Sequence, residues 1–376
     1  ETLQSVWSLQ MKFDFTSIGP DRVISGIGAL NELPGALQDL GAKRALLITG
    51  RTLATKTELV SLVADTLGSC HVGTFSECGQ HVPESSVDKA FAEAVAFNVD
   101  SLVVFGGGSP VDTAKLVVLK MIEAGLGPIS QVAIPTTLSA GEFTHAAGMT
   151  NEKTRVKHVY LDQTMQPEVI LYDPVLTRPT PPELWLTTGI KALDHAIEGV
   201  WWPNCHPFLE TMRLGAIADL TEHLARSKDP DALNDRLACQ HAAWKSILGL
   251  LSAKDVGFRL SHPLGHQIGA RWDVPHGVTS CITLPAAARF LHERSGEAQA
   301  KIAQAMGLPS DRGAAPAIEA FFETLNIPRR LSETGADRDE IPLVAEAVAA
   351  ELNQLNAPDQ DIATAERLTE LLASVW

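Results

Sequence analysis

The stretch SLVVFGGGSPVDTAK, residues 101–115, joins a continuous apolar run to three glycines and the beginning of a helical pattern. The apolar run predicts a buried strand over 101–108, and the following pattern predicts a helix over 109–125 with Pro110 in its first turn. Glycines at such a junction let an anion approach the free N–H groups of the helix N-terminus. The stretch therefore predicts a phosphate-binding turn, although a tight turn without a ligand is the plainer alternative.

Strands and helices alternate throughout the first half of the chain. The predicted strands cover residues 44–50, 70–75 and 132–136, and the predicted helices cover 54–67 and 85–97. Apolar strands separated by helices are typical of a parallel sheet that is covered on both faces. The sequence thus predicts a Rossmann-like α/β domain over residues 1–179.

The second half has a different pattern. Prolines cluster in LTRPTPPELW, residues 176–185, which favours a domain boundary there. The predicted helices beyond it cover residues 191–200, 207–226, 231–253, 255–271, 277–293, 297–306, 314–325, 338–354 and 363–374. We therefore expect an all-α domain over residues 180–376.

Composition narrows the class of protein. The chain has 376 residues, of which 45% are hydrophobic, and a net charge of −15, which argues against nucleic-acid binding. No apolar run approaches the roughly 20 residues that a membrane helix needs. The five cysteines are an odd number without a CxxC pair, as in reduced intracellular proteins. With no leader-like segment at the N-terminus, we expect a cytoplasmic protein that acts on a small molecule.

Two further segments predict a site. The loop AIPTTLSAGEFTHAAG, residues 133–148, follows another predicted strand, and two loops leaving neighbouring strands form the crevice where nucleotides bind. His262 and His266 are four residues apart and share a helix face, His276 follows them, and His195 lies upstream in LDHAIEG. Each histidine alone is more often structural, but together they predict that at least two line a common site.

With these motifs the sequence resembles the iron-containing alcohol dehydrogenase superfamily from about Phe15 to about Leu291. FGGGSPVDTAK matches the family's GGGSxxDxxK, IPTT matches its second nucleotide loop, and DHAIEG and HPLGHQIG…PHG match its metal-site segments in order and spacing. The resemblance implies the dehydroquinate synthase-like fold with an active site between the two domains. It also implies hydride transfer between NAD(P)H and a carbonyl or alcohol, and a homodimer formed through the N-terminal region.

The resemblance assigns cofactor contacts to individual residues. They are Gly107, Gly108, Ser109 and Asp112 in the first loop, Thr136, Thr137 and Thr144 in the second, and Lys157 near the nicotinamide ribose. Members that prefer NAD place an acid after the strand that ends here in ALLIT, whereas this chain continues with Gly50 and Arg51. Since nothing there repels a 2′-phosphate and Arg51 can pair with it, the sequence favours NADP(H) over NAD(H). The alternative is an Arg51 that only faces solvent.

Two features resemble the maleylacetate reductase branch of the superfamily. They are QHVP at residues 80–83, and PTTLSAGEFT at 135–144, one residue shorter than the PTTxGTGSExT of the alcohol dehydrogenases. His266, in contrast, is the residue expected in the alcohol dehydrogenases, where the reductases carry glycine. The resemblance implies an oxo acid, or a related ketone or aldehyde, as the substrate. Arg259, Arg271 and Lys191 are the cations considered for its carboxylate.

The metal site of the family consists of three histidines and an acid four residues before the first of them. Here that position holds Lys191, and we expect the side chain of Asp194 to point about 100° away from that of His195 on a helix. A divalent ion about 4 Å from an ammonium group is repelled by roughly 8 kcal/mol at an effective dielectric constant of 20. We therefore expect a site without a metal, in which Lys191 polarises the carbonyl and Lys191 or His266 supplies the proton, beside His195 and His262.

Other functions remain open on the sequence alone. Should Lys191 turn away, His195, His262 and His276 are the candidate ligands for iron or zinc, and the protein would be a metal-dependent alcohol dehydrogenase. A family member repurposed for a non-redox reaction is a second alternative. A lyase similar to the dehydroquinate synthases is a third, but it requires a lysine-rich phosphate pocket that the sequence does not indicate.

Overall fold

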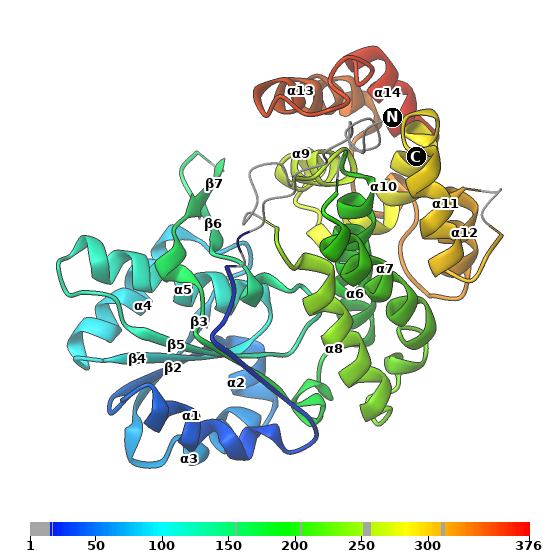
Figure 1. Ribbon diagram of the computed structural model, residues 1–376. Coiled ribbons are helices and arrows are strands. Elements are labelled where there is room, and N and C mark those ends of the chain that lie inside the picture. The colour runs from blue at the N-terminus through cyan, green and yellow to red at the C-terminus, as the bar shows by residue number, and fades with distance from the viewer. Residues whose placement is uncertain (1–15, 17, 155, 204, 251–256, 310–312) are drawn as a thin grey trace, which may run out of the picture.

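The computed structural model describes residues 16–376 apart from 17, 155, 204, 251–256 and 310–312, and apart from the side chains of 156 and 157. Its first half contains a parallel six-stranded sheet in the order β1-β8-β5-β4-β2-β3 (Figure 1). The strands are β1 (Arg22–Ser25), β2 (Ala45–Gly50), β3 (His71–Cys78), β4 (Ser101–Gly106), β5 (Ser130–Pro135) and β8 (Val169–Tyr172). The strand order reverses between β2 and β4, which is where doubly wound sheets open a ligand crevice.

Helices cover both faces of this sheet (Figure 1). They are α1 (Leu33–Asp39), α2 (Arg51–Lys56), α3 (Leu59–Leu67), α4 (Glu84–Ala96) and α5 (Gly108–Glu123). Along β2, Leu46 and Ile48 enter the core that contains residues of α4 and α5, whereas Ala45 and Leu47 enter the core with α1 and α3. Burial on both faces explains why the strands read as continuous apolar runs. The predicted α/β class is confirmed.

The sequence patterns missed three features of this half. The strands β1 and β8 are only four residues long, which is too short for periodicity to register. An antiparallel hairpin of β6 (Ala146–Asn151) and β7 (Val156–Leu161) projects from the sheet (Figure 1). The predicted helix over 54–67 is two helices, because Thr57 is extended between α2 and α3.

The second half of the described chain is helical, as predicted (Figure 1). The helices are α6 (Pro182–Trp201), α7 (Pro207–His223), α8 (Leu233–Ile247), α9 (Ser261–Trp272), α10 (His276–Phe290), α11 (Gly296–Ala305), α12 (Ala314–Glu323), α13 (Ile341–Gln354) and α14 (Ala365–Ser374). The proposed domain boundary at 179/180 lies between β8 and α6 and stays a prediction. Among the described helices, none combines the length and the apolar character that a membrane span requires.

Two predicted helices were wrong at their beginnings. The helix predicted over 191–200 begins at Pro182, nine residues earlier. The prediction over 255–271 includes residues 257–260, which are not helical, and α9 begins only at Ser261; residues 255 and 256 lie outside the described part. The side chain of Arg259 and the backbone of Leu260 are bound by groups from distant segments. Helical spacing in the sequence carries no information about such partners.

Candidate active site

The first glycine-rich turn brings two loops into contact. Gly106 ends β4 with φ 153°, and a Cβ atom there would lie 2.9 Å from Cγ of Pro110. A Cβ atom on Gly107 would lie 3.0 Å from Cγ2 of Thr137 in the second loop. The positive φ and the close contact favour glycine at 106, and a side chain at 107 would press against Thr137. The helix α5 begins at Gly108, two residues after the strand ends, so Gly108 and Ser109 form its first turn and the predicted strand over 101–108 is two residues too long.

The predicted nucleotide residues come from three adjacent strands. Gly106 of β4 pairs in register with Pro135 of β5, so the turn at Gly107 and the buried Thr136 and Thr137 lie at the same sheet edge. Thr136 is fixed through its carbonyl, which accepts a hydrogen bond of 2.8 Å from the hydroxyl of Thr180.

At the neighbouring end of β2, a Cβ atom on Gly50 would lie 3.9 Å from Pro110. The side chain of Arg51, the first residue of α2, is exposed. The three strand ends thus form an edge of the kind that binds dinucleotides.

Asp112 and Thr144 make contacts within the protein. The Asp112 carboxylate accepts a 3.1 Å hydrogen bond from the amide of Gly148, and the Thr144 hydroxyl lies 3.2 Å from the ammonium of Lys115. Lys115, which the sequence reasoning did not assign, is fully buried. Burial lowers its pKa to about 8, against the opposing effect of Asp112 and Glu142. Lys157 lies in β7, but its side chain is outside the described part.

A second cluster lies on α6. The amide of Leu138, in the second loop, donates a 3.2 Å hydrogen bond to the hydroxyl of Thr188, so α6 contacts that loop one turn before Lys191. The Lys191 side chain is 12% exposed, and its Nζ lies 3.6 Å from Oδ2 of the fully buried Asp194. The same Oδ2 accepts a 2.6 Å hydrogen bond from the hydroxyl of Ser280 on α10.

Asp194 is therefore part of the cluster, although the sequence reasoning set it aside. The expectation rested on the angle of about 100° between the side chains of Asp194 and His195, which are adjacent on the helix. The relevant neighbour is Lys191, three residues earlier on the same helix face. Nδ1 of His262, from α9, is 3.5 Å from the Asp194 carboxylate.

Glu198 holds the beginning of α9. Its carboxylate accepts backbone hydrogen bonds of 2.7 Å from Leu260, 2.6 Å from Ser261 and 3.2 Å from His262. It also lies 2.8 Å from Nδ1 of the His262 ring. Glu198 thus fixes the orientation of that ring, with Nε2 on the opposite side. The motif DHAIEG contains Glu198, but nothing local in the sequence indicated this contact across 64 residues.

The four predicted histidines form a chain of neighbouring rings. The ring centroids of His195 and His262 are 4.9 Å apart, those of His262 and His266 are 6.3 Å apart, and those of His266 and His276 are 5.7 Å apart. Phe258 stacks on His262 with centroids 3.4 Å apart. His266 is exposed, and its Nδ1 lies 2.8 Å from the carboxylate of Glu351 on α13.

Burial sets the charges in this cluster. It holds the pKa of His195 and of His262 well below the usual value, with the Lys191 charge acting in the same direction. Burial also raises the pKa of Glu198 to about 8, reinforced by the neighbouring Asp194. At neutral pH the two imidazoles are therefore neutral, and burial favours the protonated form of the Glu198 carboxyl more than water would.

These residues fit a catalytic metal poorly. In the described chain, ligand-type atoms of three side chains lie within 4.8 Å of one another, and these side chains are Asp194, Glu198 and His262. Among the described residues, the three candidate histidines do not form such a set. The Glu198 carboxylate and Nδ1 of His262 are already engaged by one another and by backbone amides, whereas Oδ1 of Asp194 and Nε2 of His262 have no hydrogen-bond partner within the part of the chain that the structure describes. The Lys191 side chain adds a positive charge to the cluster, with its Nζ 3.6 Å from the Asp194 carboxylate. A divalent ion bound to Asp194 would be repelled by this neighbouring ammonium.

Two of the cations considered for a substrate carboxylate are bound elsewhere. Arg259 is buried and forms a bidentate ion pair with Asp359, with both N···O distances 2.6 Å. Arg271 pairs with Glu340 on the protein surface. Of the three candidates, Lys191 is the one that lies among the histidines. The idea that Arg259 or Arg271 binds the substrate is therefore not supported by their contacts.

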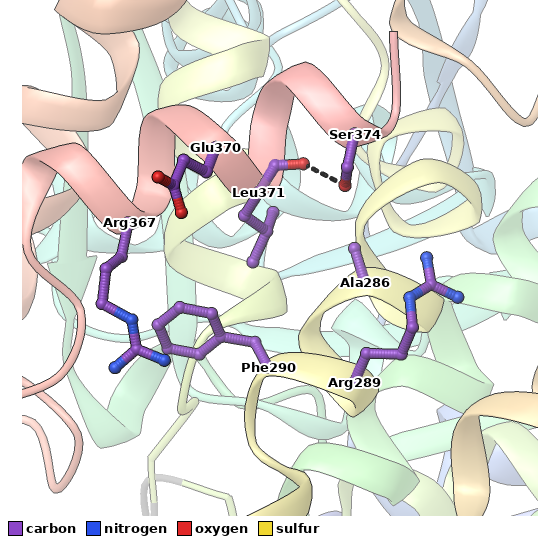
Figure 2. Close-up of a pocket in the computed structure, with 7 residues that line it drawn as sticks. All are labelled: Ala286, Arg289, Phe290, Arg367, Glu370, Leu371 and Ser374. Carbon is purple, nitrogen blue, oxygen red and sulfur yellow. Dashed lines mark hydrogen bonds between the residues drawn. The ribbon is translucent and has the colours of Figure 1, made fainter.

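A separate pocket of about 320 Å³ opens between α10 and α14 (Figure 2). Arg367 lies over the ring of Phe290, 4.6 Å from its centroid, and Arg289 is paired with Glu319. The pocket is lined by the C-terminal end of α10, whereas the histidine cluster is at the N-terminal end of that helix. Ten or more helical residues, about 15 Å, separate the two, so this pocket is not part of the candidate active site.

Comparisons with known proteins agree with this fold and identify the family. The model of the family described as iron-containing alcohol dehydrogenase matches residues 20–174, and the model of the C-terminal part of the same family matches residues 185–376. Maleylacetate reductase 2 of Cupriavidus pinatubonensis is 30% identical over 83% of this chain and 84% of its own. Lactaldehyde reductase of Escherichia coli is 28% identical over 93% of this chain and 97% of its own. The crystal structure of maleylacetate reductase from Agrobacterium tumefaciens superimposes with a TM-score of 0.85 at 25% identity and covers 98% of this chain and 99% of that one.

Proposed function

The chain belongs to the iron-containing alcohol dehydrogenase family, with features of its maleylacetate reductase branch, and on that premise we propose that it reduces an oxo acid with NADPH and without a catalytic metal. It is an oxidoreductase of this family that acts on CH–OH or C=O groups with a nicotinamide cofactor. The narrower proposal rests on one observation: the Lys191 ammonium beside Asp194, at the position where the family places an acid.

The proposed reaction uses Lys191 as the electrophile. Hydride passes from C4 of the reduced nicotinamide to the carbonyl carbon, and the electron pair of the C=O bond moves onto the oxygen. The Lys191 ammonium donates a hydrogen bond to that oxygen and stabilises the alkoxide as it forms. Asp194, whose Oδ2 lies 3.6 Å from the Lys191 Nζ, holds the ammonium in place. The alkoxide then takes a proton from Lys191 or from His266, and the donor regains its proton from solvent.

The neutral imidazoles are suited to orient the substrate. Nδ1 of His195 and Nε2 of His262 are buried and have no hydrogen-bond partner in the described chain. A buried polar atom without a partner is costly, so such an atom favours a ligand that satisfies it. Glu198 fixes the ring of His262, and Glu351 fixes that of His266. Since relatives are named for the reduction of maleylacetate and lactaldehyde, we propose a small oxo acid or hydroxyaldehyde as the substrate.

Metal removal tests this function. We expect the purified protein to oxidise NADPH in the presence of maleylacetate or a similar oxo acid, and to keep its kcat after dialysis against a strong chelator. We expect metal analysis to find far less than one equivalent of iron or zinc. Loss of activity on chelation, restored by iron or zinc, would identify a metal-dependent alcohol dehydrogenase instead. NADPH binding without turnover of any carbonyl compound would favour a non-redox role.

Arg51 is expected to select the cofactor. Replacing it with alanine removes a guanidinium that can pair with the 2′-phosphate, so the KM for NADPH should rise about tenfold or more while the KM for NADH stays unchanged. The comparison of kcat/KM for both cofactors in the wild type and in R51A checks this. A matched control is Lys56→Ala, at the other end of α2. Equal effects on both cofactors, or none, would exclude Arg51 from 2′-phosphate recognition.

The remaining assignments stay predictions. They are the homodimer, the cytoplasmic location and the individual cofactor contacts of Gly107, Gly108, Ser109, Asp112, Thr136, Thr137, Thr144 and Lys157.

A further inference from the structure

We propose that Lys115 is a positioning residue that sets the geometry of the second nucleotide loop from inside the protein. The inference rests on the proposed dinucleotide site at the two loops, but it concerns a residue that faces away from solvent and is not expected to touch the cofactor. Lys115 lies two turns into α5, the helix whose first turn carries Gly108 and Ser109. Lys115 therefore links α5, which begins at the first glycine-rich loop, to the second nucleotide loop.

The contacts of Lys115 converge on a short segment. Its Nζ donates to the carbonyls of Gly141, Thr144 and Ala146 and lies 3.2 Å from the hydroxyl of Thr144. An ammonium has three hydrogens, so these four oxygens use its whole capacity. Without it, three carbonyls in a buried turn would lose a shared donor. The turn contains Ala140, whose φ of 59° is unusual for a residue other than glycine, and it therefore needs support from outside.

Other anchors hold the same loop and show what Lys115 adds. Asp112, three residues earlier on α5, binds the amide of Gly148 in β6. Tyr172 of β8 donates a 2.8 Å hydrogen bond to the buried carboxylate of Glu142. Phe143 stacks on Trp244 of the helical half, with ring centroids 5.3 Å apart. The last two anchors hold side chains of the loop, whereas Lys115 binds its backbone carbonyls and opposes the charges of Asp112 and Glu142.

The position of this segment affects the shape of the proposed nucleotide site. Thr137 lies against Gly107, and Leu138 is bonded to α6, so the loop lies between the first glycine turn and the helix of Lys191. A shift of the segment from Gly141 to Ala146 would move both contacts. We therefore expect loss of the Lys115 ammonium to weaken nucleotide binding more than it slows the chemical step at saturating cofactor.

The test uses Lys115→Met, which keeps the length of the side chain and removes its charge and donors. We expect the Kd for NADPH, measured by fluorescence titration, to rise about 10- to 100-fold, with the KM following it and kcat changing much less. The matched control is Lys120→Met on the same helix, where the lysine pairs with Asp88 at 2.9 Å and lies away from the loop. This control should bind NADPH as the wild type does.

The outcomes separate this inference from the proposed function. K115M with a lower melting temperature but an unchanged Kd would overturn the positioning role and leave a purely structural one. If K115M does not fold, Lys115→Arg is the second variant. It keeps the charge but has a planar donor group that cannot reproduce the contacts, so the Kd of K115R for NADPH should still rise. Wild-type affinity in K115R would overturn the inference. A wild-type protein that binds neither NADPH nor NADH would contradict the proposed function itself.

Discussion

Replacing Lys191 with methionine is expected to lower kcat by about 10²- to 10³-fold, the usual effect of removing one donor to a developing oxyanion. The substitution keeps the length and the apolar part of the side chain but removes the charge that faces the substrate. Asp194 would lose its ionic partner at 3.6 Å. The measurement is the steady-state rate of NADPH oxidation with the best oxo acid found, at saturating cofactor.

Controls separate this catalytic role from damage to the fold. The Kd for NADPH should stay unchanged in K191M, because Lys191 is not in the nucleotide loops. Lys191→Arg, which keeps the charge, should recover part of kcat. Lys191→Asp restores the acid of the family motif and should make activity depend on added iron or zinc. A K191M enzyme with wild-type kcat and no bound metal would refute the role proposed for the ammonium.

Replacing Asp359 with alanine is expected to lower the free energy of unfolding by about 3–5 kcal/mol, because it leaves a buried guanidinium without its counter-ion. The side chains of Arg259 and Asp359 are 3% and 2% exposed, respectively. Arg259 also donates a 2.6 Å hydrogen bond to the carbonyl of Trp201 at the end of α6. The pair thus ties the segment before α9 both to α6 and to the turn after α13. Urea denaturation followed by circular dichroism measures the change.

Two comparisons test whether burial is the cause. The ion pair of Arg22 and Asp39 has an N···O distance of 3.0 Å, but its side chains are 47% and 72% exposed. Asp39→Ala should therefore cost less than about 1 kcal/mol. The double replacement R259M/D359L removes both charges and should be more stable than D359A alone. A small effect in D359A would mean that water reaches the Arg259 guanidinium in solution.

The parts of the site that were predictable are those encoded within a few neighbouring residues. The glycines at 106–108, the apolar strand before them and the helix after them carry their own conformational preferences. The spacing of His262 and His266 fixed a common helix face in the same way. Arg259 and Asp194 show the limit of such reasoning. Arg259 was considered as a substrate ligand because nothing near it in the chain shows that Asp359 neutralises it.

The sequence by itself determined the class of the fold and predicted the two nucleotide loops and the role of Lys191, because each of these inferences depends on local conformation or on a short motif. Only the tertiary structure decided what surrounds these residues. The contacts of Glu198 with His262 and of Lys115 with Ala146 join groups 64 and 31 residues apart. A side chain in a protein interior takes its charge and its partners from whatever packs against it, and that environment depends on how α5, α6 and α9 meet in space.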